Sequence, residues 1–206
     1  MKLTSDTLRP GQEIPREHAM GVAAEGGPVP GPNQSPHLSW SEVPEGTRSF
    51  ALICVDLDAP SKPDDVNKPD RTVPYDLPRA AFYHWVLVDM PADLRSLAQG
   101  ADADGLTAKG KPLGPTPYGT RGLNNYTQWF AGDEAMAGQY AGYDGPWPPF
   151  NDERRHRYVF TLYALDVPSL GLAGAFGAAD AEQAMKGHVL AEASIETHYA
   201  IYSDAR

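Results

Sequence analysis

The stretch SFALICVDLDAP, residues 49–60, decides the fold class of this chain. Its first nine residues are almost continuously apolar and include β-branched and aromatic side chains. A short apolar run of this composition is typical of a β-strand that is covered on both faces. Asp56 and Asp58 lie two residues apart near its end, so we expect their carboxylates to project to the same face, where the strand opens into a turn.

Two further stretches predict strands of the same kind. Residues 82–90, FYHWVLVDM, stop at Pro91, and their alternation places His84 on the face of Val86 and Val88. Residues 156–165, HRYVFTLYAL, alternate between two faces, and one face carries His156, Tyr158, Phe160 and Leu162. Shorter strands are expected at residues 3–8 and 37–40.

One helix and two long loops complete the expected architecture. Residues 178–197 repeat apolar side chains at spacings of three and four, which predicts a helix weakened by Gly187, with His188 as a packing histidine. Residues 59–81 and 99–149 are rich in proline or glycine and match neither period. Loops of this length are usually functional, so we expect them to form walls around a site and to carry a possible oligomer contact.

Composition excludes several classes of protein. The chain has 206 residues, 41% of them hydrophobic, which favours a single domain over residues 1–206. Its net charge of −10 argues against nucleic acid or an anionic membrane as partner, and the local cluster Arg154, Arg155 and Arg157 is better explained as a solvated strand edge than as a phosphate-steering patch. Cys54, the only cysteine, is expected to be a buried, inert thiol. With no signal peptide or membrane span in the sequence, we expect a cytoplasmic protein.

The three predicted strands each carry ionisable side chains at one end. If those ends converge, they form a pocket with an apolar floor and a rim of two carboxylates, two imidazoles and a phenol. Each residue alone has a structural explanation, such as an aspartate that accepts turn hydrogen bonds. Burying several ionisable groups together costs free energy unless they pair with one another or with a ligand, so their combination favours a site.

The stretch GYDGPWPPFNDERRHRY, residues 142–158, places His156 and Tyr158 directly after a proline-rich turn. With LTSDTLRPGQEIP (3–15), NQSPHLSWSEVPEGTRSFALICVDLDAP (33–60), HWVLVDMPADLRSLAQG (84–100) and GHVLAEASIETHY (187–199), it resembles the phosphatidylethanolamine-binding protein family in its bacterial Raf-kinase-inhibitor-like branch. The resemblance runs nearly from end to end. It implies a mainly β fold of two antiparallel sheets with a few peripheral helices, including one near the C-terminus, and a small anion pocket.

The resemblance also implies which residues line that pocket. In the family, the first aspartate of the D-x-D-A-P turn, the histidine of the H-W strand, and the histidine and tyrosine of the H-R-Y strand line the pocket. The matching residues here are Asp56, His84, His156 and Tyr158. The backbone N–H of Trp147 would donate to the anion. Asp58, Ala59 and Pro60 would close one wall, and Gly145 and Pro148 another. Two departures are Trp147, where bacterial members commonly have cysteine, and a longer connection between the aspartate turn and His84. An indole at this position could narrow the mouth of the pocket.

These residues predict a binding protein for a phosphate or carboxylate head group, with no cofactor, no metal and no catalytic residue, and a regulatory role is implied by the resemblance alone. Imidazoles, a phenol and backbone N–H groups are donors, and Asp56 could raise the pKa of one imidazole. By resemblance, a homodimer is possible. Three alternatives stay open: acid and base chemistry on an ester by Asp56, His84 and His156, a metal site of the same residues, and a pure interaction module. The first lacks a serine or cysteine nucleophile, and the second lacks the usual ligand spacing.

Overall fold

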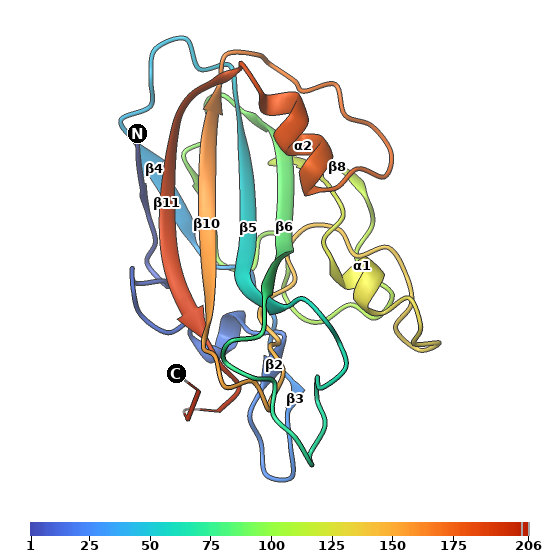
Figure 1. Cartoon of the computed structure of the whole chain (residues 1–206). Coiled ribbons are helices and arrows are strands. Elements are labelled where there is room, and N and C mark those ends of the chain that lie inside the picture. Colours follow the sequence, from blue (N-terminus) through green and yellow to red (C-terminus); the bar gives the residue numbers. More distant parts are fainter. Residues whose placement is uncertain (203, 206) are drawn as a thin grey trace.

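The computed structural model describes residues 1–202, 204 and 205, and its strands pair in antiparallel order. The largest sheet has six strands in the order β11-β10-β5-β6-β9-β8 (Figure 1). Its strands are β5 (Ser49–Pro60), β6 (Arg79–Pro91), β8 (Gly114–Thr116), β9 (Gly119–Arg121), β10 (His156–Leu165) and β11 (Val189–Tyr199).

A second sheet, in the order β1-β4-β7, lies behind the first, and a two-stranded hairpin is found at the lower end of the molecule (Figure 1). These strands are β1 (Lys2–Thr4), β4 (Leu38–Ser41), β7 (Ser96–Leu97), β2 (Gly21–Val22) and β3 (Val29–Pro30). The helices are α1 (Tyr126–Trp129), α2 (Ala178–Met185) and a 3₁₀ turn, η1 (Arg16–His18). The predicted fold class, two antiparallel sheets with a few peripheral helices, is confirmed. No helix of the described residues is long and apolar enough to cross a membrane.

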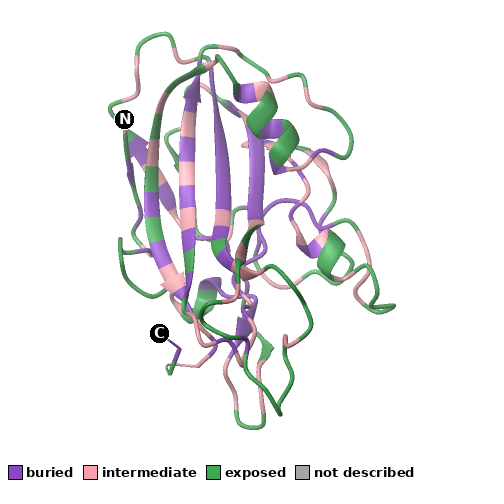
Figure 2. Cartoon of the chain, in the orientation of Figure 1, coloured by how far each residue is buried: buried purple, intermediate pink, exposed green. Residues whose placement is uncertain are grey.

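Strand β5 is covered on both faces, as its apolar run predicts. On one face, Leu52 and Cys54 join a core that includes Trp85 and the buried face of β10. On the other, Ala51 and Ile53 pack with residues of β6 and α2. Figure 2 shows the resulting purple band of buried residues along β5 and β6. Cys54 is buried, and its pKa is raised by burial and by the nearby Asp56 carboxylate, so the thiol stays protonated.

Strand β10 has the predicted bounds and the predicted alternation. Its buried face carries His156, Tyr158, Phe160 and Leu162, and the residues between them are partly or fully exposed. Since Tyr158 pairs with Asp56 across the sheet, the polar ends of β5 and β10 meet at the same place.

The predicted helix over residues 178–197 is wrong beyond Met185. Lys186 leaves the helical conformation with a ψ of 124°, Gly187 follows with a left-handed φ of +83°, and β11 begins at Val189. Strand β11 then pairs with β10 along its length. Helical spacing in this alanine-rich stretch predicts α2 correctly, but the backbone hydrogen bonds that β10 offers override it further on. His188 is not a packing residue: its exposed ring bonds to Asp166 through Nδ1 at 2.8 Å.

Candidate functional site

A cavity of about 730 Å³ lies where β5 ends and where β6 and β10 begin. Most of its wall is apolar or aromatic. These lining residues are Pro28, Ala59, Pro60, Pro63, Val66, Ala80, Ala81, Phe82, Tyr126, Trp129, Phe130, Trp147, Pro148, Pro149 and Phe150. Both long segments that the sequence leaves as loops contribute to this wall. Its volume lies within the range of small-molecule sites, which are concave and mostly apolar with a few polar groups.

Six of the eight predicted site residues line the cavity: Asp56, His84, Trp147, Pro148, His156 and Tyr158. Asp58 and Gly145 do not. Gly145 is buried against His18, and a Cβ at this position would overlap the His18 carbonyl oxygen. Its backbone N–H donates to Asn33, and its carbonyl accepts from Tyr126. Gly145 therefore allows a close backbone approach that places its neighbours.

His84 reaches the cavity because of a β-bulge that strand periodicity did not predict. In the pairing of β5 with β6, Cys54 lies opposite Trp85 and Val55 opposite Tyr83, so His84 is the extra residue between them. The expectation that His84 shares a face with Val86 and Val88 is therefore wrong, since those two pack with α2 on the other side of the sheet. A bulge redirects a side chain in this way. The His84 ring instead lies 5.2 Å from the ring of Tyr158, centroid to centroid.

His156 lies between two buried carboxylates. Its Nδ1 is 2.7 Å from Oδ2 of Asp56, and its Nε2 is 3.0 Å from Oδ2 of Asp152. Burial alone would lower the pKa of His156, but the two carboxylates outweigh it and raise the pKa to about 9. His156 is thus an imidazolium at neutral pH, as expected from Asp56. Because both N–H groups donate to protein carboxylates, neither is left for a ligand, which differs from the expected donor role.

Asp152 also joins His156 to the loop between β5 and β6. Arg79, the first residue of β6, donates to both carboxylate oxygens of Asp152, at 2.6 and 3.0 Å. Arg79 further donates to the carbonyls of Asp58, Pro74 and Leu77. The pKa of Asp152 is lowered because hydrogen bonds from His156 and Arg79 outweigh its burial. The bidentate ion pair of Arg79 with Asp152 therefore fixes the base of the loop at residues 61–78, which is the teal-to-green loop between β5 and β6 in Figure 1.

Asp58 is buried in a second ion-pair cluster. It accepts hydrogen bonds from the backbone and guanidinium of Arg157, at 3.0 and 2.8 Å, and from Arg154 at 3.1 Å. These bonds outweigh burial and lower its pKa. The predicted wall residue thus supports the cavity from behind.

Two of the three arginines in the cluster are not simply solvated, because Arg154 and Arg157 hold Asp58. Together with the groups around His156, they form one network of three carboxylates and, with His156 protonated, four cations. Its members are Asp56, Asp58, Asp152, Arg79, His156, Arg154 and Arg157. The network that adjoins the polar end of the cavity therefore carries one more positive than negative charge, within a chain of strongly negative net charge.

Tyr158 has a buried hydroxyl without a hydrogen-bond partner among the described residues. Its pKa is raised well above its usual value, first by burial and then by the Asp56 carboxylate nearby, although no well-formed hydrogen bond joins the two side chains. An unpartnered buried hydroxyl is costly and calls for an explanation, such as a bound ligand. The Tyr158 ring lines the cavity, but its hydroxyl has no accessible surface, so a ligand oxygen would reach it only by displacing the side chains that cover it.

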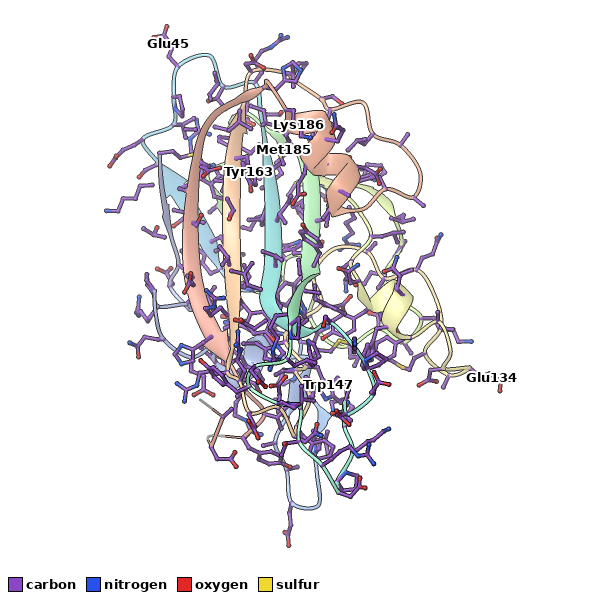
Figure 3. The ribbon with its side chains drawn as sticks, viewed as in Figure 1. Glu45, Glu134, Trp147, Tyr163, Met185 and Lys186 are labelled. Atoms are coloured by element: carbon purple, nitrogen blue, oxygen red, sulfur yellow. The ribbon has the colours of Figure 1, made fainter. Side chains whose placement is uncertain are left out.

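Trp147, labelled near the lower end of the molecule in Figure 3, lines the cavity from the turn at residues 145–149. Its indole lies directly over Gly21 in β2, where a Cβ would overlap the ring. The backbone N–H of Trp147 donates to no acceptor among the residues that the structure describes. Pro146, just before it, accepts from the backbone of Met20 and Gly21, both at 3.0 Å. The β2 hairpin therefore holds the turn just before the Trp147 N–H.

The sequence did not single out Asp144, Asp152 or Arg79. Asp144 is buried, pairs with Lys111 at 2.8 Å, and accepts from Asn33 and Asn124. These partners come from distant segments, so no local pattern indicates them. Asp152 precedes its partner His156 by four residues, and this short spacing is the only feature of the sequence that could have indicated the pair. No cluster of His, Cys, Asp and Glu in the described part of the chain has an arrangement that would hold a metal ion.

Comparison with known proteins agrees with this arrangement. A family model described as "Phosphatidylethanolamine-binding protein" matches residues 4–200. The chain is 34% identical over 195 residues to the UPF0098 protein YbhB of Escherichia coli, covering 95% of this chain and 97% of that protein. It is 32% identical over 196 residues to a UPF0098 protein of Aquifex aeolicus, covering 95% and 85% of the two chains.

Two solved structures have the same fold. The crystal structure of Escherichia coli YbcL, described as a new member of the mammalian PEBP family, superposes with a TM-score of 0.66 at 26% identity and covers 98% of both chains. A putative phosphatidylethanolamine-binding protein homologue from Chlamydia trachomatis gives a TM-score of 0.61 at 27% identity, covering 96% of this chain and 95% of that one. The match over nearly the whole sequence, together with the cavity at the predicted strand ends, shows that this chain belongs to the phosphatidylethanolamine-binding protein family.

Proposed function

We propose that this chain binds a small organic anion whose phosphate or carboxylate head group lies at the polar end of the cavity. The observation that carries the proposal is the Tyr158 hydroxyl, which is buried beside the cavity with no partner among the described residues. A ligand oxygen that displaces the side chains covering this hydroxyl would satisfy it. The backbone N–H of Trp147, also without an acceptor in the described residues, is a candidate second donor.

Charge at this end of the cavity supports an anion. His156 is protonated at neutral pH, and the surrounding network carries a small positive excess. The rest of the wall is apolar, and its volume of about 730 Å³ exceeds what a bare inorganic ion would occupy. We therefore infer a ligand with an anionic head and an apolar or aromatic body.

An esterase-like function has less support. None of the residues that line the cavity in the described structure is a serine, threonine or cysteine, so a side-chain nucleophile of these types is lacking. Both nitrogens of His156 are hydrogen-bonded to carboxylates, so this histidine is poorly placed to accept a proton.

Calorimetric titration with four ligands of similar shape tests the proposal. We expect phenyl phosphate and benzoate to bind, while benzyl alcohol and benzylamine bind at least roughly tenfold more weakly, because they lack the anionic oxygens that Tyr158 would satisfy. Equal affinities for the anions and for benzyl alcohol would show that the cavity recognises only apolar bodies, and this result would refute the proposal.

A further inference from the structure

Strand β11 is the outermost strand of the six-stranded sheet, and one of its edges faces away from the sheet (Figure 1). Among the described strands it pairs only with β10, and the register between them runs without a shift from Tyr199 to Ala191. A regular strand at the end of a sheet presents a row of backbone N–H and C=O groups that another chain can pair with.

The chain itself covers the lower end of this edge. The carbonyls of Glu196 and His198 accept from the backbone N–H groups of Gly11 and Ile14, both at 2.8 Å. The N–H of His198 donates to the carbonyl of Gln12 at 3.1 Å. These bonds show that the even-numbered residues of β11 turn their backbone groups away from β10, and that the edge accepts a neighbouring segment.

The part of the edge above this contact has no partner. Because a strand has a period of two, Glu192 and Ser194 also turn their N–H and C=O groups outward. These groups and the N–H of Glu196 form no hydrogen bond with the described residues. All three residues are exposed, and this strand is largely green and pink in Figure 2. The strand contains neither proline nor lysine, which commonly protect such edges.

Two carboxylates mark this edge as a site for a basic partner. Glu192 and Glu196 lie on the same face of β11, and neither forms a salt bridge with a described residue. The residues opposite them on β10 are uncharged. Arg157, further along β10, is already bonded to Asp58. A cation that pairs with these two glutamates must therefore come from the partner.

The other face of the strand is apolar. Ala191 and Ala193 are half-buried, and Ala193 packs against the core between the two sheets. Their side chains are small, so the rim of the core is only partly covered here. Because side chains of a strand alternate between faces, an added strand would place every second side chain beside these alanines. Apolar side chains suit those positions.

We propose that the free edge of β11 at residues 191–196 binds an extended, basic segment of a partner protein by strand addition. Two lysine or arginine side chains, four residues apart, lie opposite Glu192 and Glu196, and apolar side chains between them cover the alanines. Backbone hydrogen bonds supply affinity in this kind of recognition, and the alternating side chains supply specificity. No residue of β11 lines the cavity, so this binding needs no ligand there.

A second copy of the chain is a poorer occupant of this edge. In an antiparallel pairing of two β11 strands centred on Ser194, each Glu192 lies opposite Glu196 of the other copy. A pairing centred on Glu192 places the two copies of that residue opposite each other. Like charges directly opposite destabilise a pair of strands, and the net charge of −10 on each chain adds to the repulsion.

A nine-residue peptide with blocked ends tests the proposal. Valine occupies every second position, and the other positions read Thr, Lys, Thr, Lys, Thr, so the pattern is the same in both strand directions. The control peptide has glutamate in place of both lysines. By fluorescence anisotropy at low salt, we expect the lysine peptide to bind at least roughly tenfold more tightly than the glutamate peptide. Its binding should slow amide hydrogen exchange at Glu192, Ser194 and Glu196.

The variant Ser194→Pro removes one outward N–H from the edge. That N–H points away from β10, so a proline here leaves the β10 ladder intact, and edge strands tolerate proline. We expect the lysine peptide to bind at least roughly tenfold more weakly to Ser194→Pro than to Ser194→Ala, the control that keeps the N–H. Equal affinity for these two variants would show that the peptide binds by charge alone, and this would overturn strand addition.

The double variant Glu192→Lys and Glu196→Lys tests the charges separately and changes only exposed side chains. It should prefer the glutamate peptide, because the sign of both pairs is reversed. An unchanged preference for the lysine peptide would overturn the assignment of the two glutamates. Binding of neither peptide to the unmodified protein would refute the proposal. A dimer seen by sedimentation that Ser194→Pro abolishes and Ser194→Ala keeps would assign the edge to a second copy instead.

Discussion

The charge of His156 makes the stability of the protein depend on pH. Its pKa is raised from 6.5 to about 9 in the folded state. A raised pKa stabilises the fold fully below pH 6.5, and this contribution is lost as the pH rises through about 9. The shift corresponds to roughly 3 kcal/mol. We expect the free energy of unfolding in urea to fall by about this amount between pH 6.5 and 9.5.

The variant His156→Gln provides the comparison for this prediction. It leaves Asp56 and Asp152 without their shared cation, so we expect a loss of about 3–5 kcal/mol at pH 6.5. The dependence on pH between 6.5 and 9.5 should disappear with the imidazole. A free energy of unfolding of the wild-type protein that does not change between pH 6.5 and 9.5 would show that His156 is not held as a cation by the two carboxylates.

Tyr158→Phe separates binding from folding. Phenylalanine fills the same space without the hydroxyl that lacks a partner in the described structure. Removing an unsatisfied buried group should leave the free energy of unfolding unchanged or raise it by up to about 1 kcal/mol. The affinity for phenyl phosphate should fall roughly tenfold, because its oxygen loses a donor. Unfolding curves and calorimetry measure the two quantities, and a loss of stability without a loss of affinity contradicts the binding role.

At the level of elements, the contact between β2 and the turn at residues 145–149 positions Trp147. A Cβ at Gly21 would overlap the indole, so Gly21→Ala must displace it. We expect a cost of roughly 1–3 kcal/mol, a shifted tryptophan emission spectrum and weaker ligand binding. Gly132→Ala is the control, since a Cβ there meets no atom within 4 Å. Unchanged emission in Gly21→Ala would mean that the hairpin does not position the indole.

The loop at residues 61–78 depends on Arg79. A lysine keeps the charge but cannot make two hydrogen bonds to Asp152 while also reaching the carbonyls of Pro74 and Leu77. We expect Arg79→Lys to speed amide hydrogen exchange throughout this loop and to leave β10 protected. Arg71→Lys, in the same loop, is the matched control, because Arg71 is half-exposed and makes only surface ion pairs. Equal exchange in the two variants would contradict the anchoring role of Arg79.

For the whole molecule, a ligand that binds only the folded state must raise its stability. At a concentration of phenyl phosphate 100-fold above its dissociation constant, the free energy of unfolding should rise by about 2.7 kcal/mol. Thermal unfolding with and without the ligand measures this rise, and benzyl alcohol at the same concentration should give a smaller one. We also expect slower amide exchange in residues 61–78 and 124–130, because both segments line the cavity. A ligand that raises stability without protecting either segment would bind elsewhere.

Much of this architecture follows from local pattern. The apolar run at residues 49–57 predicts a central strand, and alternation in residues 156–165 predicts both the bounds and the buried face of β10. These features depend on side-chain period and burial, which neighbouring residues determine among themselves. The same reasoning predicted that Asp56, His156 and Tyr158 lie close together, because each is at the polar end of a strand whose centre is buried.

Tertiary pairing decided the rest. The bulge that places His84 beside Tyr158 depends on how β6 aligns with β5, and β11 forms because β10 offers it a complete set of backbone partners. The partners of His156 and Asp144 come from segments far apart in the chain, and the cavity is the space that these segments leave between them. The sequence by itself thus determined which side chains are polar and where strands run. Only the folded chain decided which hydrogen-bonding groups pair with one another, because hydrogen-bond partners are a property of proximity in space.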